Sequence, residues 1–256
     1  MKIDKSKFED WKSYYLSYQE TLASNYYIPY LNDNNIEINN KKILEIGCGN
    51  GGFIKAFSKY SPNCTGFDIK NLNWDDDEVR YLHLNIFDEN FDSQISDNFD
   101  IIILRDVIEH IDNDLNDLLF KKIKSLSNES TVILVTFPPF YSPFGLHQQA
   151  LLSSFCRYIP FLSLIPKIMM KIIFCCRKNK NIDEMLSLYD AKMSIGSFYR
   201  LIRKFNYRII DEKFFHIRPS HELRYGFKTK ESKFLYKIPI LRELLITGTA
   251  FFIKKY

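Results

Sequence analysis

The sequence lacks the features that would place it in a membrane, outside the cell or around a structural metal ion. Its five cysteines, an odd number, show neither the CxxC spacing of a metal site nor the spacing of a secreted disulfide framework. Residues 1–25 contain no apolar core of about 7–15 residues such as a secretory signal needs. No run of about 20 residues is apolar and free of charge. The pattern predicts a cytoplasmic protein with reduced thiols.

Low-complexity segments and internal repeats are also absent, and 256 residues suffice for one α/β domain. Charge, by contrast, is plentiful and unevenly distributed. Residues 1–150 carry 14 Lys and Arg against 23 Asp and Glu, a net charge of −9, whereas residues 151–256 carry 21 against 8, a net charge of +13. The basic half favours an anionic partner, which could be a membrane surface, a phosphate-bearing substrate or nucleic acid. A solvated basic surface that offsets the acidic half explains it equally well.

Residues 41–52, KKILEIGCGNGG, combine a short buried strand with a glycine-rich turn. The strand is apolar, glycines follow at positions 47, 49, 51 and 52, and an apolar helix is expected over residues 53–60. Glycine permits both a tight turn and the close approach of a ligand to the backbone. Strand, turn and helix together predict a site for a nucleotide-like ligand, in which Cys48 is a small filler of the turn.

Polar side chains follow the next two strands along the chain. Residues 64–69 are expected to form a second strand with Asp68 near its end, and residues 81–86 a third strand that carries Asn85 and Ile86. Open α/β sheets bind ligands at the carboxyl ends of their strands, where an acid can accept hydrogen bonds from both ribose hydroxyls. We therefore expect Asp68 to bind a ribose, although an Asp at a strand end also serves as a turn or helix cap.

Strands and helices alternate along the chain. The apolar runs 99–104 and 131–137 predict central parallel strands, with helices over 114–126 and, before the first strand, over 4–31. A helix over 195–205 and strands over 207–217 and 244–254 predict an antiparallel C-terminal hairpin, with 219–243 as its long connection. The expected fold is α/β: a doubly wound, mostly parallel, seven-stranded Rossmann-like sheet with a helical lid insertion.

The chain is expected to form a single domain over residues 1–256, built from four segments. These are an N-terminal helical cap (1–34), a cofactor-binding core (35–140), a helical lid or substrate insertion (141–192) and a C-terminal helix with the final strands (193–256). Within the lid, residues 151–178 are apolar but are interrupted by prolines and cations, which argues against a membrane span. They fit a segment lying on an anionic membrane surface, a lid over an apolar substrate, or an insertion packed on the sheet.

Taken together, these residues resemble the class I S-adenosylmethionine-dependent methyltransferases. The family signature acid-x-Gly-x-Gly-x-Gly is matched by Glu45, Gly47, Gly49 and Gly51. The third glycine comes two residues after the second, unlike the GxGxxG of dinucleotide-binding folds. The resemblance covers residues 40–140 well and 195–254 weakly. It implies S-adenosyl-L-methionine as the cofactor and S-adenosyl-L-homocysteine as the product.

The resemblance also implies roles for single residues. Glu45 would orient the turn and the cofactor amino group, Asp68 would bind the ribose, and Asn85, which stands where the family usually has Asp, would hold the adenine together with Ile86. The backbone carbonyl of Arg105 would bind the amino group. The full set of implied cofactor-binding residues is Glu45, Gly47, Cys48, Gly49, Gly51, Asp68, Ile69, Asn85, Ile86 and Arg105.

Residues 105–111 look like the ubiquinone-biosynthesis O-methyltransferases, which carry an acid-x-x-Glu-His pattern at this point. Here the pattern is Asp106, Glu109 and His110. On a helix these side chains share a face and could bind a divalent cation beside the acceptor hydroxyl. Alternatively, Glu109 and His110 only brace the cofactor loop, and no metal is bound.

The loop over residues 138–149, PPFYSPFGLHQQ, is similar to segments in methyltransferases of bacterial glycan and natural-product clusters. His147 is the first candidate for a general base, because an imidazole with a pKa of about 6.5 can take a hydroxyl proton as the methyl group moves. His110 is the second candidate, and the remaining histidines rank behind: His83, His216 and His221. The expected walls of the acceptor pocket are aromatic: Tyr14, Phe140, Tyr141 and Phe144.

The expected reaction is in-line transfer of a methyl group to a hydroxyl of a small molecule, a glycan or a lipid-linked acceptor. Two other functions stay open: an RNA methyltransferase, for which the basic half speaks, and a cofactor-binding protein without transferase activity. Nucleic acid is the less favoured partner. An anionic membrane surface is a further alternative partner, which residues 151–178 would contact peripherally.

Overall fold

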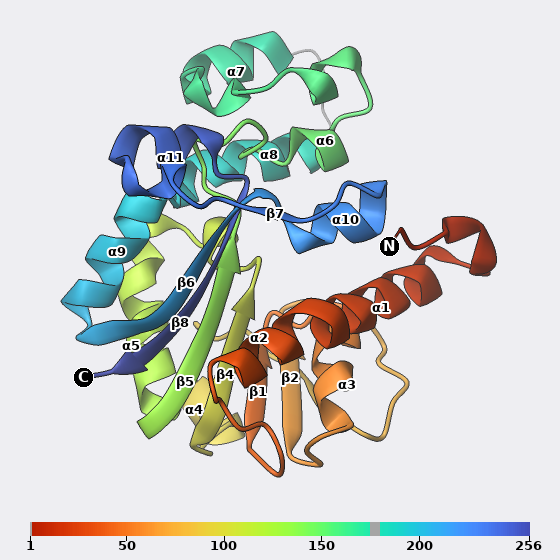
Figure 1. Ribbon diagram of the computed structural model, residues 1–256, viewed down its shortest axis with the longest axis vertical. Helices are drawn as coiled ribbons and strands as arrows, with labels where there is room; N and C mark the ends of the chain where they lie inside the picture. Colours follow the sequence, from red (N-terminus) through yellow and green to blue (C-terminus); the bar gives the residue numbers. More distant parts are fainter. Residues whose placement is uncertain (1, 175–179) are drawn as a thin grey trace.

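The computed structural model describes residues 2–174 and 180–256, and a twisted β-sheet forms its centre (Figure 1). In the described residues the sheet has eight strands in the order β3-β2-β1-β4-β5-β8-β6-β7. The strands are β1 Ile43–Ile46, β2 Cys64–Asp68, β3 Arg80–His83, β4 Phe99–Arg105, β5 Ser127–Phe137, β6 Tyr207–Ile217, β7 Lys230–Glu231 and β8 Gly248–Lys255. Strands β1 to β5 pair in parallel, and β8 pairs antiparallel with both β5 and β6. The predicted doubly wound, mostly parallel sheet is confirmed.

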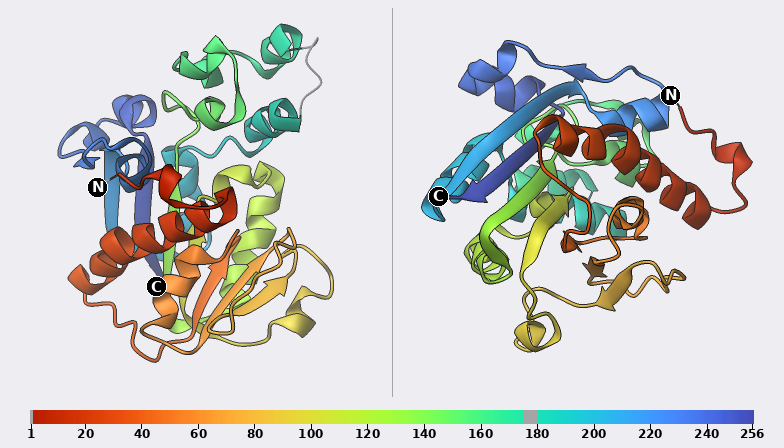
Figure 2. Two further views of the ribbon diagram at one scale, coloured as in Figure 1. Left: turned by 90° about the vertical axis from the view of Figure 1, so that its right-hand side faces the viewer. Right: turned by 60° about the horizontal axis from the view of Figure 1, so that its bottom comes forward.

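Helices cover both faces of this sheet, as Figures 1 and 2 show. The helices of the described residues are α1 Trp11–Leu22, α2 Ile28–Asp33, α3 Gly52–Ser58, α4 Phe91–Gln94, α5 Asn116–Ser125, α6 Gln148–Leu151, α7 Lys167–Phe174, α8 Lys180–Ala191, α9 Ile195–Lys204, α10 Pro219–Tyr225 and α11 Pro239–Leu245. Apolar residues of α4, α5 and α9 pack on one face, and those of α1, α2 and α3 pack on the other. Burial on both faces explains the uninterrupted apolar runs of the central strands.

Four predicted elements differ in detail. The strand expected over residues 81–86 ends at His83, so Asn85 and Ile86 follow it. The single helix expected over residues 4–31 is divided into α1, a π-helical turn over Ala23–Tyr27, and α2. The strand expected over 244–254 begins only at Gly248, because Pro239 starts α11 and residues 244–245 end it. The connection expected over 219–243 contains α10, α11 and the two-residue strand β7, which is why the sheet has eight strands rather than seven.

Residues 141–192 lie above the carboxyl ends of the parallel strands (Figure 1). Helices α6, α7 and α8 of this segment share a small core of their own, which includes Leu146, Met170 and Met185. Of residues 151–178, the last four lie outside the described residues. No helix among the described residues is long and apolar enough to cross a membrane.

The contact between α1 and α3 leaves no room for a side chain at Gly52. A Cβ atom there would lie 2.3 Å from the backbone oxygen of Leu16, which cannot move without displacing α1. We expect Gly52→Ala to lower the free energy of unfolding by about 1–3 kcal/mol, measured by urea denaturation.

Gly196→Ala is the matched control, because the three atoms nearest to a Cβ atom at this helical glycine all belong to side chains, the first being a carboxylate oxygen of Glu243 at 3.3 Å. Alanine favours a helix over glycine by up to about 1 kcal/mol, so this variant should be neutral or more stable. Equal destabilisation by both substitutions would contradict the close α1–α3 contact.

Candidate active site

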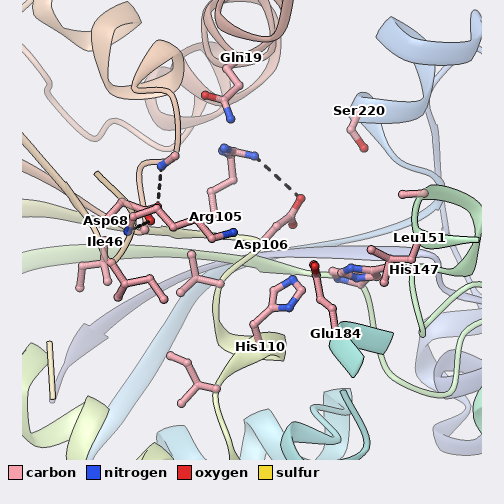
Figure 3. A pocket seen from close by; sticks show the side chains of 18 of the residues that line it. Gln19, Ile46, Asp68, Arg105, Asp106, His110, His147, Leu151, Glu184 and Ser220 are labelled. Atoms are coloured by element: carbon pink, nitrogen blue, oxygen red, sulfur yellow. Dashed lines mark hydrogen bonds and ion pairs between the residues drawn. The ribbon is translucent and has the colours of Figure 1, made fainter. Parts of the chain in front are cut away.

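A cavity of about 1070 Å³ opens where the strand order reverses, at the carboxyl ends of β1 and β4. Its walls come from parts of the chain that are far apart in sequence: α1, the glycine turn, the ends of β2 and β4, the loop after β5, and helices α8 and α10. Figure 3 shows side chains from these elements converging on one space. The volume is sufficient for a nucleoside-sized ligand and a small acceptor together.

The glycine turn forms one wall through its backbone. Gly47 and Gly51 have φ of 71° and 82°, a left-handed conformation that favours glycine. A Cβ atom at Gly51 would lie 2.5 Å from the Tyr81 ring, whose hydroxyl donates a hydrogen bond to the Gly51 carbonyl at 3.1 Å. Trp74, from the loop between β2 and β3, stacks on Tyr81 and donates its indole N–H to the Gly49 carbonyl at 2.8 Å. The turn is therefore held from outside, and its inner side faces the cavity.

Glu45 lies beneath the turn and does not line the cavity; the same holds for Cys48 and Gly51. Its carboxylate accepts a hydrogen bond from the backbone N–H of Ile54 at 3.0 Å, which ties the start of α3 to β1. The guanidinium of Arg105 lies 3.6 Å from its other oxygen. Complete burial raises the pKa of Glu45 to about 8, against the opposing effect of Arg105.

Asp68 lies at the tip of β2, and its carboxylate faces the glycine turn. One oxygen accepts a hydrogen bond from the backbone N–H of Gly49 and the other from that of Lys70, each at 2.9 Å. Both oxygens keep a further lone pair for a ligand. Ile69, Asn85 and Ile86 line the same part of the cavity, although the Asn85 side-chain oxygen already accepts from the backbone N–H of residue 87.

The end of β4 carries a network of charges. Asp106 has a left-handed backbone, with φ of 54°, and does not share a helix with Glu109 and His110, since only residues 108–110 form a short 3-10 turn. Its oxygens accept hydrogen bonds from the hydroxyl of Thr136, at 3.0 Å, and from the guanidinium of Arg218. Arg218 and Arg105 hold the pKa of Asp106 below its ordinary value, in opposition to burial.

The structure brings His147 into contact with the 108–110 turn. The His147 and His110 rings lie 5.0 Å apart, and the Nε2 atom of His147 lies 4.0 Å from a carboxylate oxygen of Glu109. Both Glu109 oxygens and His147 Nε2 are buried without a hydrogen-bond partner among the described residues. Burial, followed by the effect of His110, lowers the pKa of His147 to about 3, and burial raises that of Glu109. At neutral pH the ring therefore carries no charge.

A cation at this point would have other ligands than the predicted ones. Ligand atoms of Glu109, His110 and His147 lie within 4.8 Å of one another, whereas both oxygens of Asp106 are already bonded to Arg218 and Thr136. No ion is present. Glu184 of α8 points toward the two imidazoles from the lid side (Figure 3).

The other histidines and the predicted aromatic wall divide into two groups. His221 lines the cavity, whereas His83 and His216 lie outside its wall and contact the backbone carbonyls of residues 69 and 245. Phe144 lines the cavity, but the prediction is wrong for Tyr14, Phe140 and Tyr141, which lie outside its wall. Helix α1 presents Tyr15, Tyr18 and Gln19 to the cavity instead.

Sequence reasoning expected a helical cap and a helical lid, but it did not identify the polar residues that α1, α8 and the α10 region bring to the cavity. Gln19, Ser187, Arg218, Ser220 and Arg224 all line the cavity, yet they belong to no motif and are separated from the glycine turn by as much as 170 residues of chain. The surplus of cations in the second half was the only sign of them, and it did not indicate which arginines face inward.

The fold and the cavity define a nucleotide-binding α/β enzyme of the Rossmann-like class, with its ligand at the topological switch point. The family model described as "Methyltransferase domain" matches residues 18–163. The chain belongs to this methyltransferase family, and the class I S-adenosylmethionine-dependent type that the glycine turn predicted is confirmed. No curated protein matches the sequence.

Solved structures of similar fold include several methyltransferases. A SAM-dependent methyltransferase from Archaeoglobus fulgidus has a TM-score of 0.53 at 16% identity, with 98% of this chain and 97% of that one covered. Magnesium protoporphyrin IX methyltransferase from Synechocystis PCC 6803, solved with bound SAH, has a TM-score of 0.53 at 11% identity. The match covers 93% of this chain and 83% of that one. A possible histamine N-methyltransferase from Thermotoga maritima has a TM-score of 0.52 at 13% identity, and the match covers 96% of this chain and 97% of that one. These identities show a shared fold and leave the acceptor open.

Proposed function

We propose that this enzyme transfers the methyl group of S-adenosylmethionine to a hydroxyl of a small-molecule acceptor, with His147 as the general base. The observation that carries the proposal is one cavity that joins the glycine turn and Asp68 at one end to His147 at the other, where Glu109 lies 4.0 Å from the His147 ring. The first end suits a nucleoside, and the second can accept a proton.

Each end of the cavity has a defined task. The turn backbone and Gln19 would border the methionine part of the cofactor, Asp68 would accept the ribose hydroxyls, and Ile86 would pack on the adenine. When bound, the cofactor supplies a methyl group on a positively charged sulfur, which is the electrophile. The protein's remaining work is to align the acceptor oxygen with that methyl group and to remove the hydroxyl proton.

The proton has a path through His147. Because Nε2 faces Glu109, Nδ1 is the nitrogen free to meet the acceptor. A ring with a pKa of about 3 is a weak base by itself. Once His147 has taken the proton, its positive charge would favour the ionised form of the Glu109 carboxyl group, 4.0 Å away. The two groups would therefore titrate as a pair.

Calorimetry with S-adenosylmethionine and with NAD tests the cofactor, and a labelled-methyl screen tests the acceptor. We expect binding of S-adenosylmethionine, no binding of NAD, and transfer to a hydroxyl compound. Binding without transfer to any acceptor class would favour a non-catalytic protein. Transfer to RNA, with retention that falls steeply as salt rises, would favour an RNA methyltransferase instead.

An apolar surface of α7 bears on where the acceptor comes from. Ile168, Met169, Ile172 and Ile173 are 51–65% exposed on one side of the helix, while Met170 on the other side is buried in the lid core. Lys171 of the same helix is exposed as well. An apolar helix face with a cation suits the interface of an anionic membrane. We propose that the lid rests on such a surface and receives a lipid-linked acceptor from it.

We therefore expect the protein to co-sediment with vesicles that contain anionic lipid and to be released by salt. The paired substitutions Ile168→Ser and Ile172→Ser should weaken binding about tenfold or more, because they remove apolar area from the contact. Tyr60→Ser with Ile210→Ser is the control, since these side chains are 42% and 39% exposed outside the lid. Absence of binding to anionic vesicles at low salt would refute the membrane contact and leave the cofactor site untouched.

A further inference from the structure

Arg224, on α10, brings a positive charge to the cavity without a carboxylate of its own. Its side chain lines the cavity, and no acid of the described residues forms an ion pair with it. The groups that act on its charge are Tyr15, Tyr18, Tyr225 and another cation, Arg218. Partial burial makes a charge without a counter-charge unfavourable, and a bound anion would offset this.

The position of Arg224 is fixed by aromatic rings. Its guanidinium lies 4.7 Å from the centre of the Tyr18 ring and 5.8 Å from that of Tyr15. Tyr18 is itself buried and packs in the core on that face of the sheet. Helix α10 is also held by a hydrogen bond from the backbone N–H of Ile3 to the backbone carbonyl of Leu223, at 2.9 Å. Such a platform orients a guanidinium and distinguishes it from a mobile surface arginine.

The other two arginines that line the cavity have acids within reach. Arg218 donates a hydrogen bond to Asp106, and Arg105 lies 4.0 Å from Asp106 and 3.6 Å from Glu45. Among the described residues, Arg224 is the cavity-lining arginine that forms no ion pair with an acid.

We propose that Arg224, held on Tyr15 and Tyr18, binds a carboxylate or phosphate group of a ligand in this cavity. The inference rests on the proposed function and adds an anion-binding residue to its site. Two groups could supply the anion. One is the carboxylate of the methyl donor, because Gln19, next to Tyr18, lies beside Gly49 of the turn. The other is an acidic group on the acceptor, because Ser220 and His221 of α10 line the same cavity.

Calorimetry on the intact protein distinguishes the two sources. In the first arm, S-adenosylmethionine and its decarboxylated analogue are titrated into the wild type, Arg224→Met and Arg224→Lys. If the donor carboxylate binds Arg224, the wild type prefers the intact cofactor by about tenfold or more, the methionine variant loses this preference, and the lysine variant keeps part of it.

In the second arm, inorganic phosphate is titrated into the complex with S-adenosylhomocysteine. If the acceptor supplies the anion, the wild-type complex binds phosphate and Arg224→Met binds it at least about tenfold more weakly. Arg203→Met is the control for both arms, because Arg203 is exposed on α9 outside the cavity.

The outcomes separate this inference from the proposed function. If Arg224→Met equals the wild type in both arms, the anion-binding role is overturned even though the cofactor binds. If the wild type binds neither S-adenosylmethionine nor S-adenosylhomocysteine, the proposed function itself fails. Thermal unfolding checks that the variants are folded, and the lysine variant keeps the charge should methionine disturb α10.

Discussion

His147→Asn should reduce the rate of methyl transfer about 10²–10⁴-fold while the affinity for S-adenosylhomocysteine stays within a few-fold of the wild type. Asparagine is the substitution of choice because His147 has a φ of 54°, a left-handed conformation that asparagine tolerates better than alanine does. The rate is measured with the acceptor that the screen identifies, and the affinity by calorimetry. The physical reason is that the variant keeps the cofactor end of the cavity and removes only the proton acceptor.

His83→Asn is the matched control, because this histidine is exposed, lies outside the cavity wall and bonds through its ring to the backbone carbonyl of Ile69. Near-normal turnover of His147→Asn would exclude the ring as the base. Loss of activity in chelator that Mn²⁺ or Zn²⁺ restores would indicate instead that Glu109, His110 and His147 bind a cation, as the closeness of their ligand atoms allows.

The same assignment fixes the sign of the pH dependence. A base is active when neutral, and its activity is lost as pH falls through its pKa in the folded protein. Because burial and His110 lower the pKa of His147 to about 3, kcat/KM should show no acid limb from this ring between pH 8 and 5. An inflection near the ordinary histidine pKa of about 6.5 would contradict the buried, paired state of the ring.

Asp68→Asn should weaken the binding of S-adenosylhomocysteine about 100-fold or more. In the wild type, the two carboxylate oxygens accept the N–H groups of Gly49 and Lys70 and retain lone pairs for the ribose hydroxyls. Asparagine replaces one acceptor oxygen by an NH₂ group, which is a donor. A side-chain N–H then faces a backbone N–H, with which it cannot form a hydrogen bond, and one hydrogen bond to the ribose is lost. Each lost hydrogen bond to a charged group costs about 1.5–3 kcal/mol.

Asp100→Asn is the control for this substitution. Asp100 also accepts a hydrogen bond from a backbone N–H group, that of Lys42 at 2.9 Å. It lies at the amino end of β4, whereas the cavity lies at the carboxyl end of this strand. Calorimetry measures the affinities, and thermal unfolding shows whether both variants are folded. A loss of less than about fivefold for Asp68→Asn would exclude the ribose as its ligand.

The cofactor end of the cavity was predictable because its parts are local in sequence. A strand, a glycine turn and a helix follow one another within 20 residues, and right-handed parallel connections bring the ends of β1 and β2 side by side. The periodicity of apolar residues therefore predicted where the strands lie along the chain and placed Asp68 near the end of the second one. The family resemblance narrowed the ligand to S-adenosylmethionine.

The acceptor end depended on contacts that no local pattern encodes. The partner of Asp106 is Arg218, 112 residues further along the chain, and that of His147 is Glu109. The pattern Asp106-x-x-Glu109-His110 suggested one helical face, yet the left-handed backbone at Asp106 turns its carboxylate away to α10. Backbone conformation at a single residue thus decided which acids lie together.

By itself, the sequence determined the sheet and the glycine turn, since these rest on short-range periodicity and on the steric freedom of glycine. The class of enzyme followed from the resemblance of this turn to the methyltransferase signature. Only the tertiary structure decided which histidine meets a buried carboxyl group, which tyrosines of α1 face the cavity and which arginine of α10 lacks a counter-charge. Those properties arise from desolvation and charge pairing between distant segments, and these exist only once the chain has folded.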